Sequence, residues 1–220
     1  MRIGGYVKQS LLDWDGVLAA VVFTKGCNFR CGYCHNPSLV IPALCDRSPD
    51  IDEGEVLSYL SRRRGWLEGV VITGGEPTLQ PDLADFIRRV RALGLRVRLD
   101  TNGTHPGLLA ALIADGLLDA VAMDVKSIPD LEHYARVTPG ITPAQVDAVR
   151  RSIDLLRRSG IEYQLRTTLI PGIHTPHIKN LLDTAFSGDH YACHAFRDPG
   201  RDGLVADHTG IAPVNPPNSP

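Results

Sequence analysis

Three cysteines stand close together near the start of the chain, at Cys27, Cys31 and Cys34, in a C-x3-C-x2-C pattern. Gly26 and Gly32 lie beside them, so the backbone of this loop can approach a bulky group closely. Thiolates this near in sequence can converge on one centre, and such clusters select zinc, copper(I) or iron–sulfur. Closed zinc sites and cubes held by cysteine alone take four ligands. Three local thiolates therefore predict a metal centre with one position left open, the pattern of sites that do chemistry.

Other readings of these cysteines remain open but fit less well. A zinc ion could take His35 as its fourth ligand, although Cys34 and His35 are adjacent and would chelate one ion awkwardly. A disulfide framework conflicts with the odd cysteine count of 5 and with the absence of a recognisable signal peptide. Free cysteines without a targeting segment indicate a cytoplasmic protein. Cys45 and Cys193 are expected to be inert thiols.

Length and charge narrow the class of protein further. A chain of 220 residues can form one domain with a substantial core. The net charge of −2 gives no electrostatic case for nucleic acid or an anionic membrane as the main partner. The apolar run at residues 17–23 is far too short for a membrane span. Residues 198–220 are rich in glycine and proline and are predicted to be a disordered tail, which leaves residues 1–197 as the domain.

Apolar runs alternate along the chain with segments of helical pattern. After an edge strand and turn near the start, buried strands are expected at residues 17–23, 69–73, 95–100, 119–123, 161–170 and 190–196. Helices are expected at residues 52–64, 81–93, 106–114, 143–158 and 176–186. Strands that alternate with helices form parallel βα units with right-handed crossovers. The sequence therefore predicts an α/β fold, a partial TIM-type barrel of about six parallel βα units that is open along one side.

Polar residues gather wherever one of these strands ends. They occupy residues 25–35, 74–77, 100–103, 124–126 and 170–174. In α/β barrels and sheets, the carboxyl ends of parallel strands are where functional sites assemble. The polar loops are therefore expected to meet at one mouth.

Two of these loops carry a recognisable combination. Cys27-x3-Cys31-x2-Cys34 after the first parallel strand and Gly74-Gly75-Glu76-Pro77 after the second resemble the radical S-adenosylmethionine (SAM) superfamily. More narrowly, residues 4–13, 34–37, 73–80, 99–103, 122–126 and 166–168 resemble the anaerobic ribonucleoside-triphosphate reductase activating proteins, relatives of the pyruvate formate-lyase activating enzymes. The resemblance covers about residues 2–197 and implies a radical SAM core domain. Trp14-Asp15-Gly16 stands where that family often has tyrosine–proline–glycine, which is expected to loosen the entry turn.

The resemblance implies a definite chemistry. Cys27, Cys31 and Cys34 would hold a [4Fe–4S] cluster whose fourth iron binds the amino and carboxylate groups of SAM. The reduced cluster would cleave SAM to a 5′-deoxyadenosyl radical, which makes the protein an oxidoreductase. The implied partners are a glycyl-radical enzyme, with anaerobic ribonucleotide reductase as the first candidate, and a flavodoxin- or ferredoxin-type electron donor. The short chain leaves no separate substrate domain, so the open barrel flank is expected to admit a loop of the partner.

The resemblance also assigns SAM contacts in the first two loops. Tyr33 would lie against the adenine, and Gly74 and Gly75 would bring backbone carbonyl groups close to the methionyl ammonium, which a Cβ would obstruct. Glu76 would hold either loop amides or that ammonium.

Residues at the next strand ends complete the implied SAM site. Asp124 and Lys126 are two residues apart and are expected on one face. With Asp100 they would surround the SAM carboxylate and a monovalent cation. The alternatives are turn capping for Asp100 and Asp124 and a plain surface position for Lys126. Asn102 is expected mainly to form a turn, and a contact with the ligand is its secondary interpretation.

The last candidates come from the final two strands. Arg166 is expected to face the barrel interior, where it would either bind the ligand or pair with Glu76 or Asp124. His194 stands where relatives place a glutamine or histidine beside SAM, and His174 is a further contact candidate.

Three other functions stay open at this stage. The protein could activate a pyruvate formate-lyase-type enzyme, or it could be another radical SAM enzyme acting on a peptide or metabolite. From a different class, it could be a non-catalytic iron–sulfur redox sensor or a zinc-bound structural protein.

Overall fold

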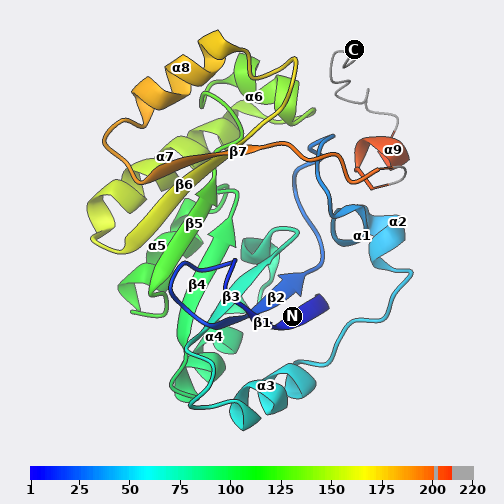
Figure 1. The fold of residues 1–220 in the computed structure, drawn as a ribbon, viewed down its shortest axis with the longest axis vertical. Coiled ribbons are helices and arrows are strands. Elements are labelled where there is room, and N and C mark those ends of the chain that lie inside the picture. Colours follow the sequence, from blue (N-terminus) through cyan, green and yellow to red (C-terminus); the bar gives the residue numbers. More distant parts are fainter. Residues whose placement is uncertain (201–202, 210–220) are drawn as a thin grey trace.

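The computed structural model describes residues 1–200 and 203–209 and is built on a single seven-stranded sheet (Figure 1). The strands follow one another in chain order: β1 (Ile3–Ser10), β2 (Ala19–Thr24), β3 (Gly69–Gly74), β4 (Arg96–Thr101), β5 (Ala120–Asp124), β6 (Glu162–Leu169) and β7 (Tyr191–Ala195). β1 pairs antiparallel with β2, and every later pair is parallel. The order begins at β1 and ends at β7, so the sheet is open. The predicted α/β fold with a partial TIM-type barrel is confirmed.

The five expected helices are present between the parallel strands. They are α3 (Glu53–Arg62), α4 (Leu83–Ala92), α5 (Pro106–Ala114), α7 (Pro143–Ser159) and α8 (Pro176–Ala185). Local chemistry sets their ends. Thr142 and Gln145 form a reciprocal capping box at the start of α7, and Gly160 ends that helix with a φ of 71°.

In the described part of the chain, five short helices were missing from the sequence-based expectation. They are α1 (Pro37–Val40), α2 (Pro42–Cys45), the 3-10 helix η1 (Pro77–Leu79), α6 (Leu131–Val137) and α9 (Ala206–Thr209). Three of them start with a proline, whose fixed φ suits the first helical position. Helices of three to seven residues are too short to show a 3.6-residue hydrophobic period.

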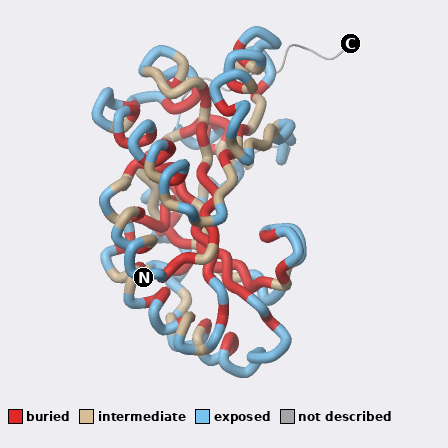
Figure 2. Tube along the Cα trace, turned by 90° about the vertical axis from the view of Figure 1, so that its left-hand side faces the viewer, coloured by how far each residue is buried: buried red, intermediate tan, exposed pale blue. Residues whose placement is uncertain are grey.

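Figure 2 shows the buried residues concentrated in the interior of the molecule, and they form two apolar clusters. On the outer face Val22, Val70 and Ile72 belong to a large apolar cluster with the helices, which includes Phe86 of α4. The inner face is filled at its base by a smaller cluster around Trp14, with Val17, Ala19, Val21, Val71 and Ala120. Above this apolar base the inner face becomes polar, and the site lies there.

Trp14 closes the base of the barrel. Its side chain is only 2% exposed, and its carbonyl accepts a hydrogen bond from Val17 N at 3.0 Å. A Cβ on Gly69 would come within 2.9 Å of the Trp14 ring, so the ring packs directly on the start of β3. Burial of the indole thus anchors Trp14, while the β1–β2 register shifts between Val7 and Ser10 just before the turn, and the loosened entry turn stays a prediction.

The predicted tail begins at residue 198, and two parts of it, residues 201–202 and 210–220, lie outside the described residues. Residues 203–209 end in α9, and the chain reaches this helix from β7 beside α1 and α2 (Figure 1). Val205 N donates to Cys34 O at 3.0 Å, and Ala206 N donates to Gly32 O at 3.1 Å. Val205 and Ala206 therefore contact the cysteine loop (residues 25–35), while the boundary at residue 197 stays a prediction.

Among the helices that the structure describes, none combines the length and the apolar character that a membrane crossing requires.

Candidate functional site

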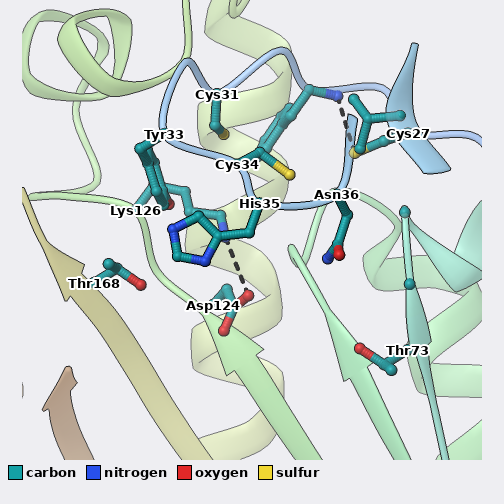
Figure 3. Close-up of a pocket in the computed structure, with 14 residues that line it drawn as sticks. Cys27, Cys31, Tyr33, Cys34, His35, Asn36, Thr73, Asp124, Lys126 and Thr168 are labelled. Carbon is teal, nitrogen blue, oxygen red and sulfur yellow. Dashed lines mark hydrogen bonds and ion pairs between the residues drawn. The ribbon is translucent and has the colours of Figure 1, made fainter. Parts of the chain in front are cut away.

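A cavity of about 240 Å³ lies at the carboxyl ends of the strands. The cysteine loop forms one side, and the ends of β3, β5 and β6 form the other (Figure 3). Its lining residues are Cys27, Phe29, Cys31, Tyr33, Cys34, His35, Asn36, Val40, Thr73, Gly74, Gly75, Asp124, Lys126 and Thr168. Three of the five polar loops that were expected to meet here, residues 25–35, 74–77 and 124–126, contribute to the lining, whereas residues 100–103 and 170–174 do not.

The three clustered cysteines all face this cavity (Figure 3). Burial raises the pKa of the Cys27 thiol to about 12 and also raises the pKa of Cys31 and of Cys34. Neutral thiols are therefore favoured in the protein alone, and a nearby cationic metal is what would make thiolates stable here.

The donor set fits a cluster of several metal atoms. Among the described residues, no three His, Cys, Asp or Glu side chains are gathered closely enough to hold one metal ion. The cysteines instead surround a shared cavity, and in an iron–sulfur cube each thiolate binds a different iron. Cys27, Cys31 and Cys34 could thus occupy three corners of such a cube.

Gly74 and Gly75 allow the loop after β3 to press against the start of the cysteine loop. Gly74 has a φ of 120°, and a Cβ on it would come within 2.3 Å of Thr24 N. A Cβ on Gly75 would come within 2.0 Å of Gly26 O. Gly75 N also donates to Thr24 O at 2.8 Å. No larger residue fits at either position, and both glycines line the cavity.

Glu76 is only 1% exposed and is held by four donors. Its carboxylate accepts from Thr101 Oγ1 and Asn102 N, each at 2.7 Å, and from the backbone and hydroxyl groups of Thr78. Burial raises the pKa of Glu76, although these hydrogen bonds oppose that shift. Of its two expected roles, the structure shows the contacts for holding loop amides, because Glu76 does not line the cavity.

Five charged side chains form a chain of ion pairs on the inner face, which we call the charge ladder. It runs from Arg98 to Asp100 (3.0 Å), Asp100 to Arg166 (3.1 Å), Arg166 to Asp124 (3.0 Å) and Asp124 to Lys126 (3.1 Å). Arg166 therefore pairs with Asp124, as one alternative proposed, and with Asp100, which sequence reasoning did not link to it. Arg98 was missed, although the two-residue spacing of Arg98 and Asp100 on β4 signals a shared face.

The charge ladder shifts the protonation of its members. Burial alone would raise the pKa of Asp124, but the nearby Arg166 and Lys126 outweigh it and hold that pKa well below its usual range. Burial likewise opposes the charge on Lys126, yet Asp124 raises the pKa of Lys126 well above its usual value. Asp124 and Lys126 therefore stay ionised near neutral pH, within a ladder of three basic and two acidic side chains.

Lys126 stands where the ladder reaches the cavity. Its ammonium nitrogen lies 5.8 Å from the centroid of the Tyr33 ring, and both residues line the cavity (Figure 3). His174 Nε2 lies 3.0 Å from Lys126 O, and His174 Nδ1 accepts from Ile170 N at 2.9 Å. His174 therefore fixes the backbone of the strand end and does not itself line the cavity.

Four other candidates also lie outside the cavity lining. Asp100 and Arg166 belong to the charge ladder beneath it, and Asn102 lies in the loop after β4. His194 is exposed on β7, where it pairs in register with Thr168 of β6. Sequence reasoning missed Thr73 and Thr168, although both lie at the carboxyl ends of predicted strands.

The geometry thus defines a class of protein, a partial α/β barrel in which three cysteines and a glycine-rich loop (residues 74–77) surround one cavity. The model of the Radical SAM superfamily matches residues 21–185. This protein belongs to the Radical SAM superfamily, whose members use an iron–sulfur cluster and SAM.

Three relatives show how the similarity is distributed. A protein of Methanocaldococcus jannaschii described as a glycyl-radical enzyme activating enzyme is 30% identical over 197 residues, which cover 88% of this chain and 79% of the relative. The pyruvate formate-lyase-activating enzyme of Clostridium pasteurianum is 28% identical, over 77% of this chain and 69% of the relative. A protein of Thermococcus kodakarensis described as a GTP 3′,8-cyclase is 28% identical over 75% of this chain, which spans about half (52%) of that relative.

Solved structures share the fold. Streptococcus suis SuiB bound to S-adenosylmethionine superposes with a TM-score of 0.62 at 14% identity, over 90% of this chain and 45% of SuiB. SuiB bound to its precursor peptide SuiA gives a TM-score of 0.65 at 13% identity, over 92% of this chain and 43% of SuiB. The chain therefore spans less than half of SuiB, and the likeness shows the fold alone.

Proposed function

We propose that this protein is a glycyl-radical-enzyme activase, with anaerobic ribonucleotide reductase as the first candidate partner. The similarity to the Methanocaldococcus jannaschii activating enzyme carries the proposal, because it extends over most of both chains. The match to the cyclase covers only about half of that relative. A pyruvate formate-lyase-type enzyme is the second candidate partner.

Each part of the cavity has a proposed task. Cys27, Cys31 and Cys34 hold a [4Fe–4S] cluster, which when reduced supplies the electron that cleaves SAM. Gly74 and Gly75 place backbone groups beside the methionyl ammonium, because glycine has no Cβ to block such a close approach and no larger residue fits at these positions.

The proposed site for the rest of SAM uses the other side of the cavity. Tyr33 offers an aromatic face to the adenine, and Lys126 offers a positive charge to the carboxylate. The charge ladder supports this role for Lys126, because its five groups carry one positive charge in excess. The predicted monovalent cation would share the carboxylates of Asp100 and Asp124 with the arginine and lysine side chains that already contact them.

The remaining site residues would act through these groups. Asp100, Asp124 and Arg166 would orient Lys126, and Glu76 with Asn102 would fix the loops that face SAM. His194 is proposed to contact SAM or the partner from the exposed edge of the sheet. An electron donor of the flavodoxin or ferredoxin type would reduce the cluster.

The test starts from protein reconstituted with iron and sulfide without oxygen. Electron paramagnetic resonance (EPR) of the reduced protein is expected to show a cluster signal that changes when SAM is added. Mixing with reductant, SAM and a candidate ribonucleotide reductase is expected to give the doublet of a glycyl radical on the reductase. A doublet that forms instead on a pyruvate formate-lyase-type enzyme identifies the second candidate.

Other outcomes would reject the proposal. SAM cleavage with no radical on any glycyl-radical enzyme, together with steady turnover of a peptide or metabolite, would indicate another radical SAM enzyme. A cluster signal that ignores SAM would indicate a redox sensor. A protein that takes up zinc and no iron would indicate a structural metal site.

A further inference from the structure

Three side chains at the cysteine loop and the loop after β4 form a closed ring of hydrogen bonds. Asn28 Nδ2 donates to Thr104 Oγ1 at 2.8 Å, Thr104 Oγ1 donates to Asn102 Oδ1 at 2.7 Å, and Asn102 Nδ2 donates to Asn28 Oδ1 at 2.8 Å. Within the ring every member donates one bond and accepts one bond, all in the same direction. Outside it, Asn102 Oδ1 also accepts from Thr104 N, and Thr104 Oγ1 lies 3.3 Å from His105 Nδ1. We call this feature the amide ring. Such a closed arrangement orders all three side chains together.

One side of the amide ring is rigid. Asn102 N donates to the buried carboxylate of Glu76 at 2.7 Å, and Thr104 N donates to Asn102 Oδ1 at 3.0 Å. Between them Gly103 has a φ of 77°, and a Cβ on it would come within 2.0 Å of Met123 Cε. The loop after β4 is therefore fixed both to the glycine-rich loop and to β5.

The other side of the ring belongs to the cysteine loop. Asn28 directly follows Cys27, and it is partly exposed whereas Asn102 and Thr104 are buried. The carbonyl group of Cys27 accepts a hydrogen bond from Arg30, a residue of the same loop. The side chain of Asn28 reaches out of this loop to the fixed loop after β4.

We propose that Asn28 is a positioning residue that uses the amide ring to hold Cys27 at a fixed distance from the glycine-rich loop. The cysteine that binds the cluster and the loop that faces SAM would then keep one geometry. This inference rests on the proposed function, since it takes Cys27 as a cluster ligand. Asn28 does not line the cavity, so it acts through its neighbour and not on the ligand.

Thr104 provides a sharp test because it lies away from the cavity. Thr104→Val keeps the shape of the side chain but removes the hydroxyl that accepts from Asn28 and donates to Asn102. Thr104→Ser keeps that hydroxyl. The matched control is Ser152→Ala, which removes the 2.7 Å bond from Ser152 Oγ to Gly103 O and loosens the same loop while leaving the amide ring complete.

The measurement is the rate at which reconstituted holoenzyme loses its cluster to excess iron chelator, followed by visible absorbance. Thr104→Val is expected to lose the cluster roughly fivefold faster than the unmodified protein, the effect of losing about one net hydrogen bond from the amide ring. Thr104→Ser and Ser152→Ala are expected to stay near the unmodified rate. The SAM-induced change in the EPR signal is expected to be smaller in Thr104→Val and restored in Thr104→Ser.

Equal rates in Thr104→Val and the unmodified protein would overturn the inference. An equal acceleration in Ser152→Ala would also overturn it, because general loosening of the loop would then explain the effect. If Thr104→Val does not fold, Asn28→Ala decides in its place by the same readouts. An unmodified protein that takes up no cluster would refute the proposed function itself, and the inference would fall with it.

Discussion

Arg166 is the centre of the charge ladder, so its removal should cost stability that can be estimated from its contacts. Its Nε binds Asp124 at 3.0 Å and its Nη2 binds Asp100 at 3.1 Å, and its side chain is 20% exposed. Hydrogen bonds to charged groups contribute roughly 1.5–3 kcal/mol each. After this removal Asp100 would still pair with Arg98, and Asp124 would still pair with Lys126. Neither carboxylate is left without a partner, so we take the lower value of about 1.5 kcal/mol for each lost bond. Arg166→Leu should therefore lower the free energy of unfolding by about 3 kcal/mol at neutral pH.

The loss should also depend on pH in a defined direction. Arg166 and Lys126 overcome the effect of burial and hold the pKa of Asp124 below its usual value of 3.8. A carboxyl group with a lowered pKa stabilises the folded state fully above its unfolded pKa, and this contribution is lost as the pH falls toward the folded pKa. The difference between Arg166→Leu and the unmodified protein should thus be constant from pH 7 to pH 5 and shrink below about pH 3.8.

Urea denaturation at pH 7, 5 and 3 would measure this difference. The matched control is Arg88→Leu, because Arg88 also binds two carboxylates, Asp85 at 2.7 Å and Asp115 at 3.3 Å, but is 51% exposed. Exposed pairs of this kind contribute at most about 1 kcal/mol. A loss in Arg166→Leu no larger than in Arg88→Leu, or one that persists unchanged at pH 3, would refute the electrostatic account of the ladder.

Three further perturbations follow from the site. Gly75→Ala should lower the free energy of unfolding by about 1–3 kcal/mol in urea denaturation, because the added Cβ would come within 2.0 Å of Gly26 O. In the metal-free protein, burial raises the pKa of Cys27 to about 12, so the folded state holds this proton more tightly than the unfolded state does. The contribution of Cys27 to the free energy of unfolding should be complete below pH 9 and fall by up to about 1.4 kcal/mol per pH unit toward pH 12. Cys27→Ala should flatten this slope. Cys34→Ala should fold normally by circular dichroism but bind much less iron after reconstitution than Cys45→Ala, whose thiol lies outside the cavity.

Each of these predictions has an outcome that contradicts it. For Gly75→Ala the control is Gly107→Ala, where a Cβ meets nothing within 4 Å, and equal stability of the two variants would show that the Gly75 contact is readily relieved. An unchanged pH slope in Cys27→Ala would mean that other groups set it. Equal iron content in Cys34→Ala and Cys45→Ala would remove Cys34 from the proposed ligands.

The architecture was largely predictable because its signals are local. The buried parallel strands are continuous apolar runs, and β3 (Gly69–Gly74) extends only one residue past its predicted end. α6 was not predicted, since its start depends on Asp130 accepting from His133 N and its seven residues carry little periodic signal. Helix boundaries set by one capping bond are visible in coordinates and weak in sequence.

The site was predictable by position and less so by partner. The cysteines, Gly74, Gly75 and Lys126 were expected at strand ends and do line the cavity. The ion pair between Arg166 and Asp124 depends on the β5–β6 register, which places these two residues directly opposite each other. The sequence alone does not state that register, so it could not choose among the partners of Arg166.

The backbone contacts between the tail and the cysteine loop left no signal in the sequence. Composition predicted disorder beyond residue 198, yet Val205 is fully buried and donates its amide to the cysteine loop. Any residue except proline supplies a backbone amide, so no residue type marks such a contact.

The contact between Val205 and the cysteine loop has a consequence for how the protein is made. During translation Cys34 emerges from the ribosome long before Val205 and Ala206 are added to the chain. The amides of these two residues donate to the carbonyl groups of Cys34 and Gly32. A nascent chain therefore presents its three cysteines without those two donors. Cellular machinery that delivers iron and sulfide would meet the final shape of this loop only after translation has passed α9.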